Sequence, residues 1–140
     1  MEWHNGDYRI SDDKTLLSVG RICRLLCQNY WATRGFRETI KLYLKHSLCY
    51  GVYYRGQQIG FARAVTDMAT IYWIADVIIA PEHRGKGLGK QLVTCIVESD
   101  VLKDLHGLLA TDDAQSLYEQ CGFTRDDDLI MLRRARFRSF

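Results

Sequence analysis

The apolar residues in the first third of the chain recur every three or four positions, which is the period of an α-helix with one buried face. The first series predicts a helix that is capped at Ser11 or Asp12 and runs to about Asn29. Its apolar members are Leu16, Val19, Cys23, Leu26 and Tyr30. A second series predicts a helix over about residues 37–46, with Phe36, Ile40, Tyr43 and Leu44 on one face. A short strand at residues 8–10 precedes both helices.

The pattern changes near residue 48 to stretches rich in aromatic and β-branched residues, which favour strands. Residues 48–54 and 58–66 predict two strands joined by a hairpin turn at residues 55–57. A longer strand follows over residues 70–80, and its apolar run Val77-Ile78-Ile79 indicates burial on both faces.

The last third of the chain predicts two helices that alternate with two strands. A helix over about residues 87–99 is followed by a short strand at residues 107–111. Asp112 is the predicted N-cap of the next helix, with Gln115 as its capping-box partner, and Gly122 ends that helix in the left-handed conformation. Residues 129–134 predict a final strand.

The order β α α β β β α β α β predicts an α/β fold of the α+β type, in which about four helices flank a mixed, mostly antiparallel central sheet. Its single β–α–β crossover, from residue 71 to residue 111, should be right-handed. The chain contains one proline and no low-complexity segment or repeat, so residues 1–140 are expected to form one domain.

Composition excludes several classes of protein. With 140 residues, 47% hydrophobic and 26% charged, the chain can bury a core, and its net charge of +2 is too small to indicate a nucleic-acid partner. No apolar run approaches the roughly 18 residues of a membrane span. The N-terminal residues lack a signal-peptide pattern, so we expect a cytoplasmic protein. The five cysteines follow no disulfide or zinc spacing, which predicts free thiols and no metal site.

The strongest candidate for chemistry is a basic glycine loop between the strand at residues 70–80 and the helix that follows it. The loop reads Arg84-Gly85-Lys86-Gly87-Leu88-Gly89, with Lys90 next. Glycines let the backbone approach an oxygen closely, and the first amides of a helix have no internal acceptor. A phosphate-bearing ligand therefore fits this loop.

Two common phosphate motifs do not match this loop. In a Walker A alignment, Arg84 replaces the first glycine and Gln91 replaces the hydroxyl residue that holds Mg²⁺. A dinucleotide fingerprint needs G-x-G-x-x-G after a first strand, whereas this loop lies in mid-chain and reads G-x-G-x-G. What fits is a diphosphate held by loop amides, with Arg84, Lys86 and Lys90 nearby.

These residues resemble the GNAT superfamily of acetyl-CoA-dependent N-acetyltransferases. Residues 84–89 match its signature [QR]-x-x-G-x-[GA], and residues 114–123, A-Q-S-L-Y-E-Q-C-G-F, match its A-x-x-L-Y-x-x-x-G-F segment. The resemblance covers about residues 48–123 and implies an acetyltransferase that binds acetyl-CoA. The main chain of Val77, Ile78 and Ile79 would pair with the pantetheine arm. The amides of the loop would hold the pyrophosphate; these residues are Arg84, Gly85, Lys86, Gly87, Leu88, Gly89 and Lys90.

The resemblance also implies roles near the thioester. Tyr118 would act as the general acid beside the sulfur of coenzyme A. Thr111 stands where many members have an asparagine that contacts the cofactor. Many members carry a catalytic glutamate at the position of Ala75, and the adjacent Asp76 replaces it only if a bulge turns its side chain.

Other candidates for the base are Asp67, His46 and ordered water. Tyr30, Trp31 and Arg34, between the two N-terminal helices, are the candidate acceptor-binding residues, with burial under the sheet as their alternative role.

The leading hypothesis is direct transfer of acetyl from acetyl-CoA to an amine in a ternary complex. The acceptor would be a small molecule or a peptide, with no nucleic-acid or membrane partner. The alternative is a non-catalytic acyl-CoA-binding or regulatory module on the same fold. The basic segment at residues 133–138 could contact nucleic acid, although a solvated strand edge accounts for it better. A homodimer through the final strands is compatible with this order.

Overall fold

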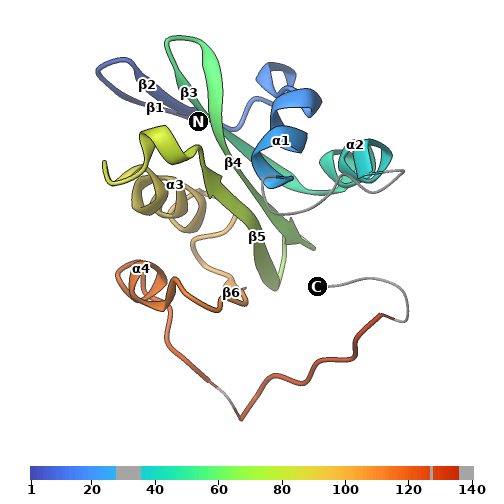
Figure 1. Ribbon diagram of the computed structural model, residues 1–140. Coiled ribbons are helices and arrows are strands. Elements are labelled where there is room, and N and C mark those ends of the chain that lie inside the picture. The colour runs from blue at the N-terminus through green and yellow to red at the C-terminus, as the bar shows by residue number, and fades with distance from the viewer. Residues whose placement is uncertain (28–35, 127, 136–140) are drawn as a thin grey trace.

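The computed structural model describes residues 1–27, 36–126 and 128–135, and its centre is a curved sheet of six strands (Figure 1). The strands follow the chain in the order β1-β2-β3-β4-β5-β6, and each adjacent pair is antiparallel except β5 and β6, which are parallel. Their bounds are β1 Glu2–Asn5, β2 Tyr8–Ser11, β3 Leu48–Tyr54, β4 Gln57–Thr66, β5 Ile71–Ile79 and β6 His106–Leu108. The mostly antiparallel sheet with one β–α–β crossover is confirmed.

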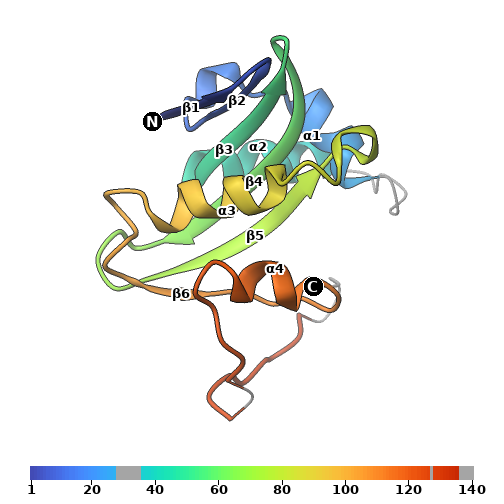
Figure 2. The same cartoon turned by 90° about the vertical axis from the view of Figure 1, so that its left-hand side faces the viewer.

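Four α-helices flank the sheet: α1 Val19–Leu26, α2 Phe36–His46, α3 Leu88–Val97 and α4 Gln115–Glu119. Helices α1 and α2 cover one face and α3 covers the other, while α4 lies beyond β6 (Figure 2). The buried side chains form two clusters, one on each face of the sheet. Ile22 and Ile40 pack with Cys49 and Phe61 in one buried cluster, and the side chains of α3 belong to the other.

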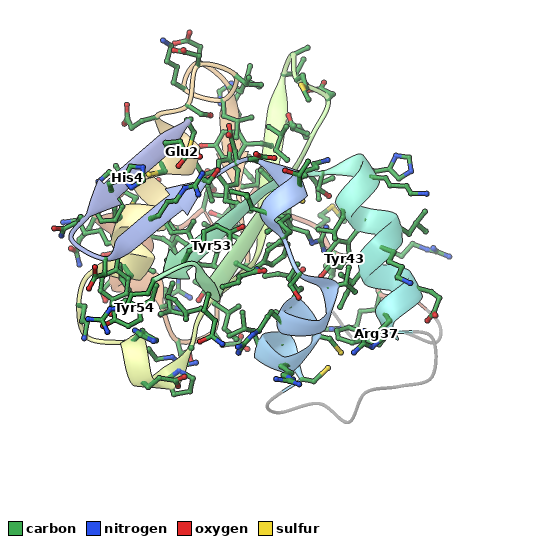
Figure 3. The ribbon with its side chains drawn as sticks, turned by 90° about the horizontal axis from the view of Figure 1, so that it is seen from above. Glu2, His4, Arg37, Tyr43, Tyr53 and Tyr54 are labelled. Atoms are coloured by element: carbon green, nitrogen blue, oxygen red, sulfur yellow. The ribbon has the colours of Figure 1, made fainter. Side chains whose placement is uncertain are left out.

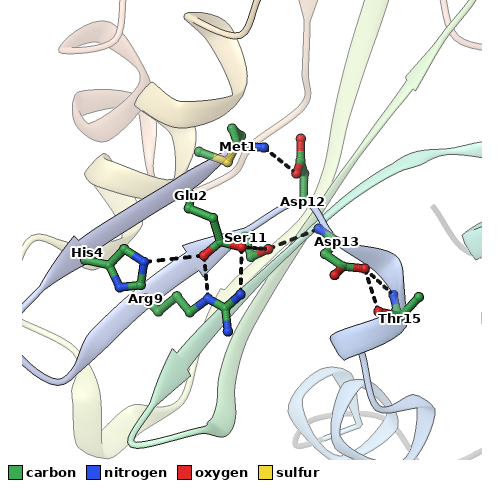
Figure 4. Close-up of polar contacts among 8 residues, drawn as sticks. All are labelled: Met1, Glu2, His4, Arg9, Ser11, Asp12, Asp13 and Thr15. Carbon is green, nitrogen blue, oxygen red and sulfur yellow. Dashed lines mark hydrogen bonds and ion pairs between the residues drawn. The ribbon is translucent and has the colours of Figure 1, made fainter.

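The sequence pattern missed strand β1. The missing strand forms a hairpin with β2 that turns at Gly6, whose φ is +58°. Both strands are four residues long, and β1 is largely exposed, but polar contacts hold it to β2 (Figure 4). Glu2 accepts hydrogen bonds from Arg9 Nη2 and Ser11 Oγ, both at 2.7 Å, and a further one from Arg9 Nε. Bonds from Arg9, and then from Ser11, lower the pKa of Glu2 to about 2.

The predicted start of the first helix was wrong. Ser11 contacts Glu2 and the amide of Asp13, so it is not available as a helix cap. Asp13 caps a separate 3₁₀ turn at Lys14–Leu16, and α1 begins only after Ser18, whose Oγ accepts from the amide of Arg21 at 3.2 Å. Two polar caps, Asp13 and Ser18, thus divide one periodic apolar series into two helical segments.

The predicted final strand was also wrong. Residues 129–134 form no strand, and their trace lies apart from the sheet (Figure 1). The apolar side chains at this point are exposed, Met131 by 96% and Leu129 by 74%. Strand β6 is also shorter than expected, ending at Leu108. The homodimer through final strands stays a prediction.

Within the part of the chain that the structure describes, no helix is both long and apolar enough to cross a bilayer. Within the same residues, no cluster of three or more His, Cys, Asp or Glu side chains is arranged to hold a metal ion.

Replacing Tyr53 with phenylalanine should stabilise the protein. The Tyr53 hydroxyl is buried without a hydrogen-bond partner among the described residues, and burial raises its pKa to about 12. Removing an unsatisfied buried hydroxyl should raise the free energy of unfolding by about 1 kcal/mol, or the Tm by about 3 °C. Calorimetry can compare the Tm of Tyr53→Phe with that of Tyr8→Phe, a variant that loses a 2.7 Å hydrogen bond to His83. Equal losses of Tm in the two variants would contradict the prediction.

Candidate active site

The parallel pair β5 and β6 separates in the middle of β5. Pairing runs from Ile71–His106 to Trp73–Leu108, and β5 then continues alone on this side to Ile79. Strand β6 ends because the chain turns toward α4. The second half of β5 therefore offers main-chain groups on an edge to which an extended ligand could add as a strand.

The glycine loop follows directly from this edge. Ala80 is buried, and a 3₁₀ turn at Pro81–His83 leads into the loop and α3 (Figure 2). Gly85 and Gly87 have φ values of +78° and +77°, a left-handed conformation that favours glycine. A Cβ at Gly85, Gly87 or Gly89 would meet no atom within 4 Å. The loop therefore presents bare backbone to open space.

The amides of the loop lack acceptors. The first hydrogen bond of α3 runs from Gln91 N to Gly87 O at 3.0 Å, and no side chain caps the helix. Within the described residues, the N–H groups of residues 85–90 have no hydrogen-bond partner. Together with about half a positive charge from the helix dipole, these groups are suited to bind an anion.

Basic and aromatic side chains hold the loop in place. Arg84 Nε donates to the carbonyl of Ile79 at 2.9 Å, which ties the loop to the end of β5. His83 Nδ1 and the Tyr8 hydroxyl share a 2.7 Å hydrogen bond, and the Tyr54 ring lies 4.9 Å from the His83 ring. Lys86 Nζ lies 5.8 Å from the centre of the Tyr8 ring. These contacts brace the loop from the β2–β3 side of the sheet.

Tyr118 lies on α4, on the other side of the gap between β5 and β6. Its side chain packs partly buried against the main core, edge-on to Phe123 at 6.0 Å. Burial raises its pKa, and the nearby Cys121 and Asp113 add to the effect. The phenol is therefore held in its protonated form and can donate a hydrogen bond at neutral pH.

The start of α4 differs from the prediction. Ala114, not Asp112, is the N-cap residue, and no side chain caps the helix. Gln115 Nε2 instead donates to the Asp112 carbonyl at 3.4 Å. Thr111 Oγ1 accepts from the amide of Ala114 at 3.1 Å, so this side chain shapes the turn while its proton stays free to donate. The left-handed Gly122 at the end of the helix is confirmed, with φ +95°.

A bulge in β5 redirects the side chain of Asp76. Ile78 pairs with Phe61 and Ala75 with Arg63, so residues 76 and 77 together face a single residue of β4. Asp76 has a left-handed φ of +57°, which is unusual for a residue other than glycine. Its Oδ2 accepts from Arg63 Nε at 2.6 Å. The bulge needed for a carboxylate at position 76 to replace one at position 75 is present.

Arg63 and Tyr43 complete a cluster with Asp76, on the α2 face of the sheet. The guanidinium Cζ lies 4.1 Å from the centre of the Tyr43 ring, and Tyr43 projects from α2 toward the sheet (Figure 3). The Tyr43 hydroxyl is buried without a partner among the described residues. Burial, and then the charge of Asp76, raise its pKa. Arg63 was not among the residues predicted from the sequence, although a charged residue inside the apolar strand 57–66 was a usable signal.

The other predicted residues are less well placed. Asp67 lies in the turn before β5, where its carboxylate accepts from the Thr70 hydroxyl and from the amides of Thr70 and Ala69, and these contacts lower its pKa. His46 is exposed in the last turn of α2. The candidate acceptor residues lie outside the described residues; they are Tyr30, Trp31 and Arg34.

Comparisons with known proteins agree with this geometry. The family described as "Acetyltransferase (GNAT) domain" matches residues 45–125. A protein from Gibberella zeae described as an acetyltransferase is 29% identical over 119 residues, which are 71% of this chain and 67% of that relative. The chain spans only 29% to 32% of the length of four plant relatives.

Solved structures share the fold. A GNAT-family protein from Xanthomonas campestris pv. campestris has a TM-score of 0.83 and 36% identity, over 91% of this chain and 93% of that chain. A Clostridium acetobutylicum protein solved with acetyl-CoA has a TM-score of 0.65 at 17% identity, over 90% of this chain and 94% of that one. The glycine loop, the divided strand pair and these matches have one common explanation: the chain belongs to the GNAT acetyltransferase family.

Proposed function

We propose that this protein is an N-acetyltransferase that moves acetyl from acetyl-CoA to a small-molecule or peptide amine by direct attack in a ternary complex. The observation that carries the proposal is the pair formed by the loop with unpaired amides at residues 85–90 and the open edge of β5 beside it. The loop suits a diphosphate, and the open edge of β5 suits an extended arm that contains amides. Coenzyme A contains both groups. Acetyl transfer is the general activity of the family.

The residues present fit this cofactor. The amides of residues 85–90 would hold the pyrophosphate, with Arg84, Lys86 and Lys90 as the nearby cations. The main chain of Val77, Ile78 and Ile79 would pair with the pantetheine amides, because β6 has left this edge of β5. Thr111 could donate a hydrogen bond from the opposite side of the gap.

Tyr118 would assist departure of the thiolate. Full proton transfer from a phenol of pKa about 10 to a thiolate of pKa about 8.5 is uphill by roughly 2 kcal/mol. Burial raises the pKa of Tyr118 and so widens that gap. The phenol would therefore act first as a hydrogen-bond donor to the developing negative charge, and the proton would reach sulfur late.

Asp76 would accept the proton released by the amine. An ordinary primary amine with a pKa near 10.4 is neutral in only about one molecule in a thousand at pH 7.4. A carboxylate beside the amine favours binding of the ammonium form and takes one proton from it, directly or through water, so that the neutral amine can attack. The nitrogen loses its second proton to water as the C–N bond forms, and a proton from water later restores the Tyr118 phenol. The C–S bond breaks in the same sequence, and Tyr118 supplies the proton that completes the thiol.

Calorimetry and a thiol assay together test the proposal. We expect saturable binding of acetyl-CoA to the purified protein, and release of free coenzyme A that depends on an added amine. Tight binding without amine-dependent release across a broad panel would instead favour the non-catalytic acyl-CoA-binding module. Absence of saturable binding would refute both functions.

A further inference from the structure

Arg63 occupies an unusual position on β4. Its neighbours Ala62 and Ala64 are fully buried in the α3 side of the core, so Arg63 faces the α2 side of the sheet. Its side chain is 20% exposed and that of Asp76 is 29% exposed. The two charges therefore lie at the bulge, partly desolvated but still within reach of a ligand.

The guanidinium of Arg63 is oriented but not saturated. Only its Nε donates to Asp76, at 2.6 Å, whereas a bidentate pair would also use a terminal nitrogen. Stacking at 4.1 Å over the Tyr43 ring fixes the plane of the group. Among the described residues, its terminal nitrogens make no hydrogen bond. Terminal N–H groups held in a fixed plane are suited to a carboxylate.

The charges of the cluster indicate what ligand it matches. A lone ammonium at Asp76 would be attracted by the carboxylate but repelled by the adjacent guanidinium. A ligand with an ammonium and a carboxylate on the same carbon atom would satisfy both groups. Polyamines and peptide lysine side chains bring positive charge without the matching negative group.

Building on the proposed function, we propose that the acceptor is a free α-amino acid, whose ammonium group lies at Asp76 and whose carboxylate is bound by Arg63. Arg63 is then the residue that selects the substrate class. The unpaired Tyr43 hydroxyl provides a third polar group beside the same pair of charges.

The test compares amino acids with their decarboxylated counterparts. Leucine is paired with 3-methylbutylamine and phenylalanine with phenethylamine, and release of coenzyme A is measured at equal concentrations of neutral amine. We expect kcat/KM to be at least tenfold higher for the amino acid of each pair. Equal or higher kcat/KM for the decarboxylated amines would overturn the inference and leave the acetyltransferase function standing.

Variants of Arg63 sharpen the test. Arg63→Gln should raise KM for the amino acids at least tenfold and bring the ratio of kcat/KM between each amino acid and its amine to about one, so that the preference disappears. Arg63→Lys keeps the positive charge and should retain part of the preference for amino acids. Arg9→Gln, which breaks the exposed pair with Glu2, is the matched control and should retain the full preference.

The outcomes separate the two proposals. If Arg63→Gln retains the full preference, or if the protein binds acetyl-CoA but acetylates no amino acid, the substrate inference is wrong. If acetyl-CoA itself does not bind, the proposed function is wrong.

Discussion

Replacing Gly87 with aspartate should weaken binding of acetyl-CoA by at least a hundredfold. The backbone at Gly87 has a φ of +77°, which aspartate tolerates better than most residues, so the fold should survive. Its new side chain would enter the open space in front of the loop, where we place the pyrophosphate. Two like charges about 4 Å apart repel by about 4 kcal/mol at an effective dielectric constant near 20. Titration calorimetry of both proteins measures the change.

Gly56→Asp is the matched control for this variant. Gly56 has a φ of +80°, and a Cβ there would also meet open space, but it lies at the tip of the β3–β4 hairpin. Its substitution should leave acetyl-CoA affinity within about twofold, a change of less than 0.5 kcal/mol. Similar losses in the two variants would show that backbone strain, rather than contact with phosphate, explains the effect.

Tyr118→Phe should lower kcat by about a hundredfold to a thousandfold, which is within the usual range for loss of a general acid. The ring keeps its packing against the core and Phe123, so the dissociation constant of acetyl-CoA should change little. Kinetics combined with equilibrium binding separate the two effects. An unchanged kcat would remove Tyr118 from the mechanism.

The pKa of Tyr118 also predicts the alkaline pH dependence. Burial disfavours the phenolate and raises the pKa above its ordinary value of 10.0, so the donor form persists to higher pH than in a free tyrosine. The decline of kcat that reports loss of this proton should therefore lie above about pH 10. A decline centred well below that value, and absent from Tyr118→Phe, would mean that the phenol is more acidic than its burial implies.

The parts that local patterns determine were predictable from the sequence. The central strands, α2 and α3 follow apolar periodicity over seven or more residues, and the glycine loop has its own composition. The left-handed Gly122 follows from its place after an apolar helix. These features depend on neighbours in the sequence, so no long-range contact was needed to find them.

Features that depend on pairing partners were missed. Strand β1 is held by Arg9 and Ser11 across the hairpin, and its own four residues show little apolar character. The apolar run at residues 129–132 has the composition of a strand but no strand beside it. The sequence alone could not show whether β5 has a bulge at Asp76, because the position of a bulge depends on the register between β4 and β5.

With Asp76 as the proposed base, its backbone conformation opposes stability to catalysis at a single residue. A side chain in the left-handed region carries a conformational penalty of roughly 1–2 kcal/mol, and glycine would remove it. Glycine would also remove the carboxylate. Selection for a more robust fold and selection for turnover therefore favour different residues at this position, so a more heat-resistant variant obtained here would come at the expense of rate.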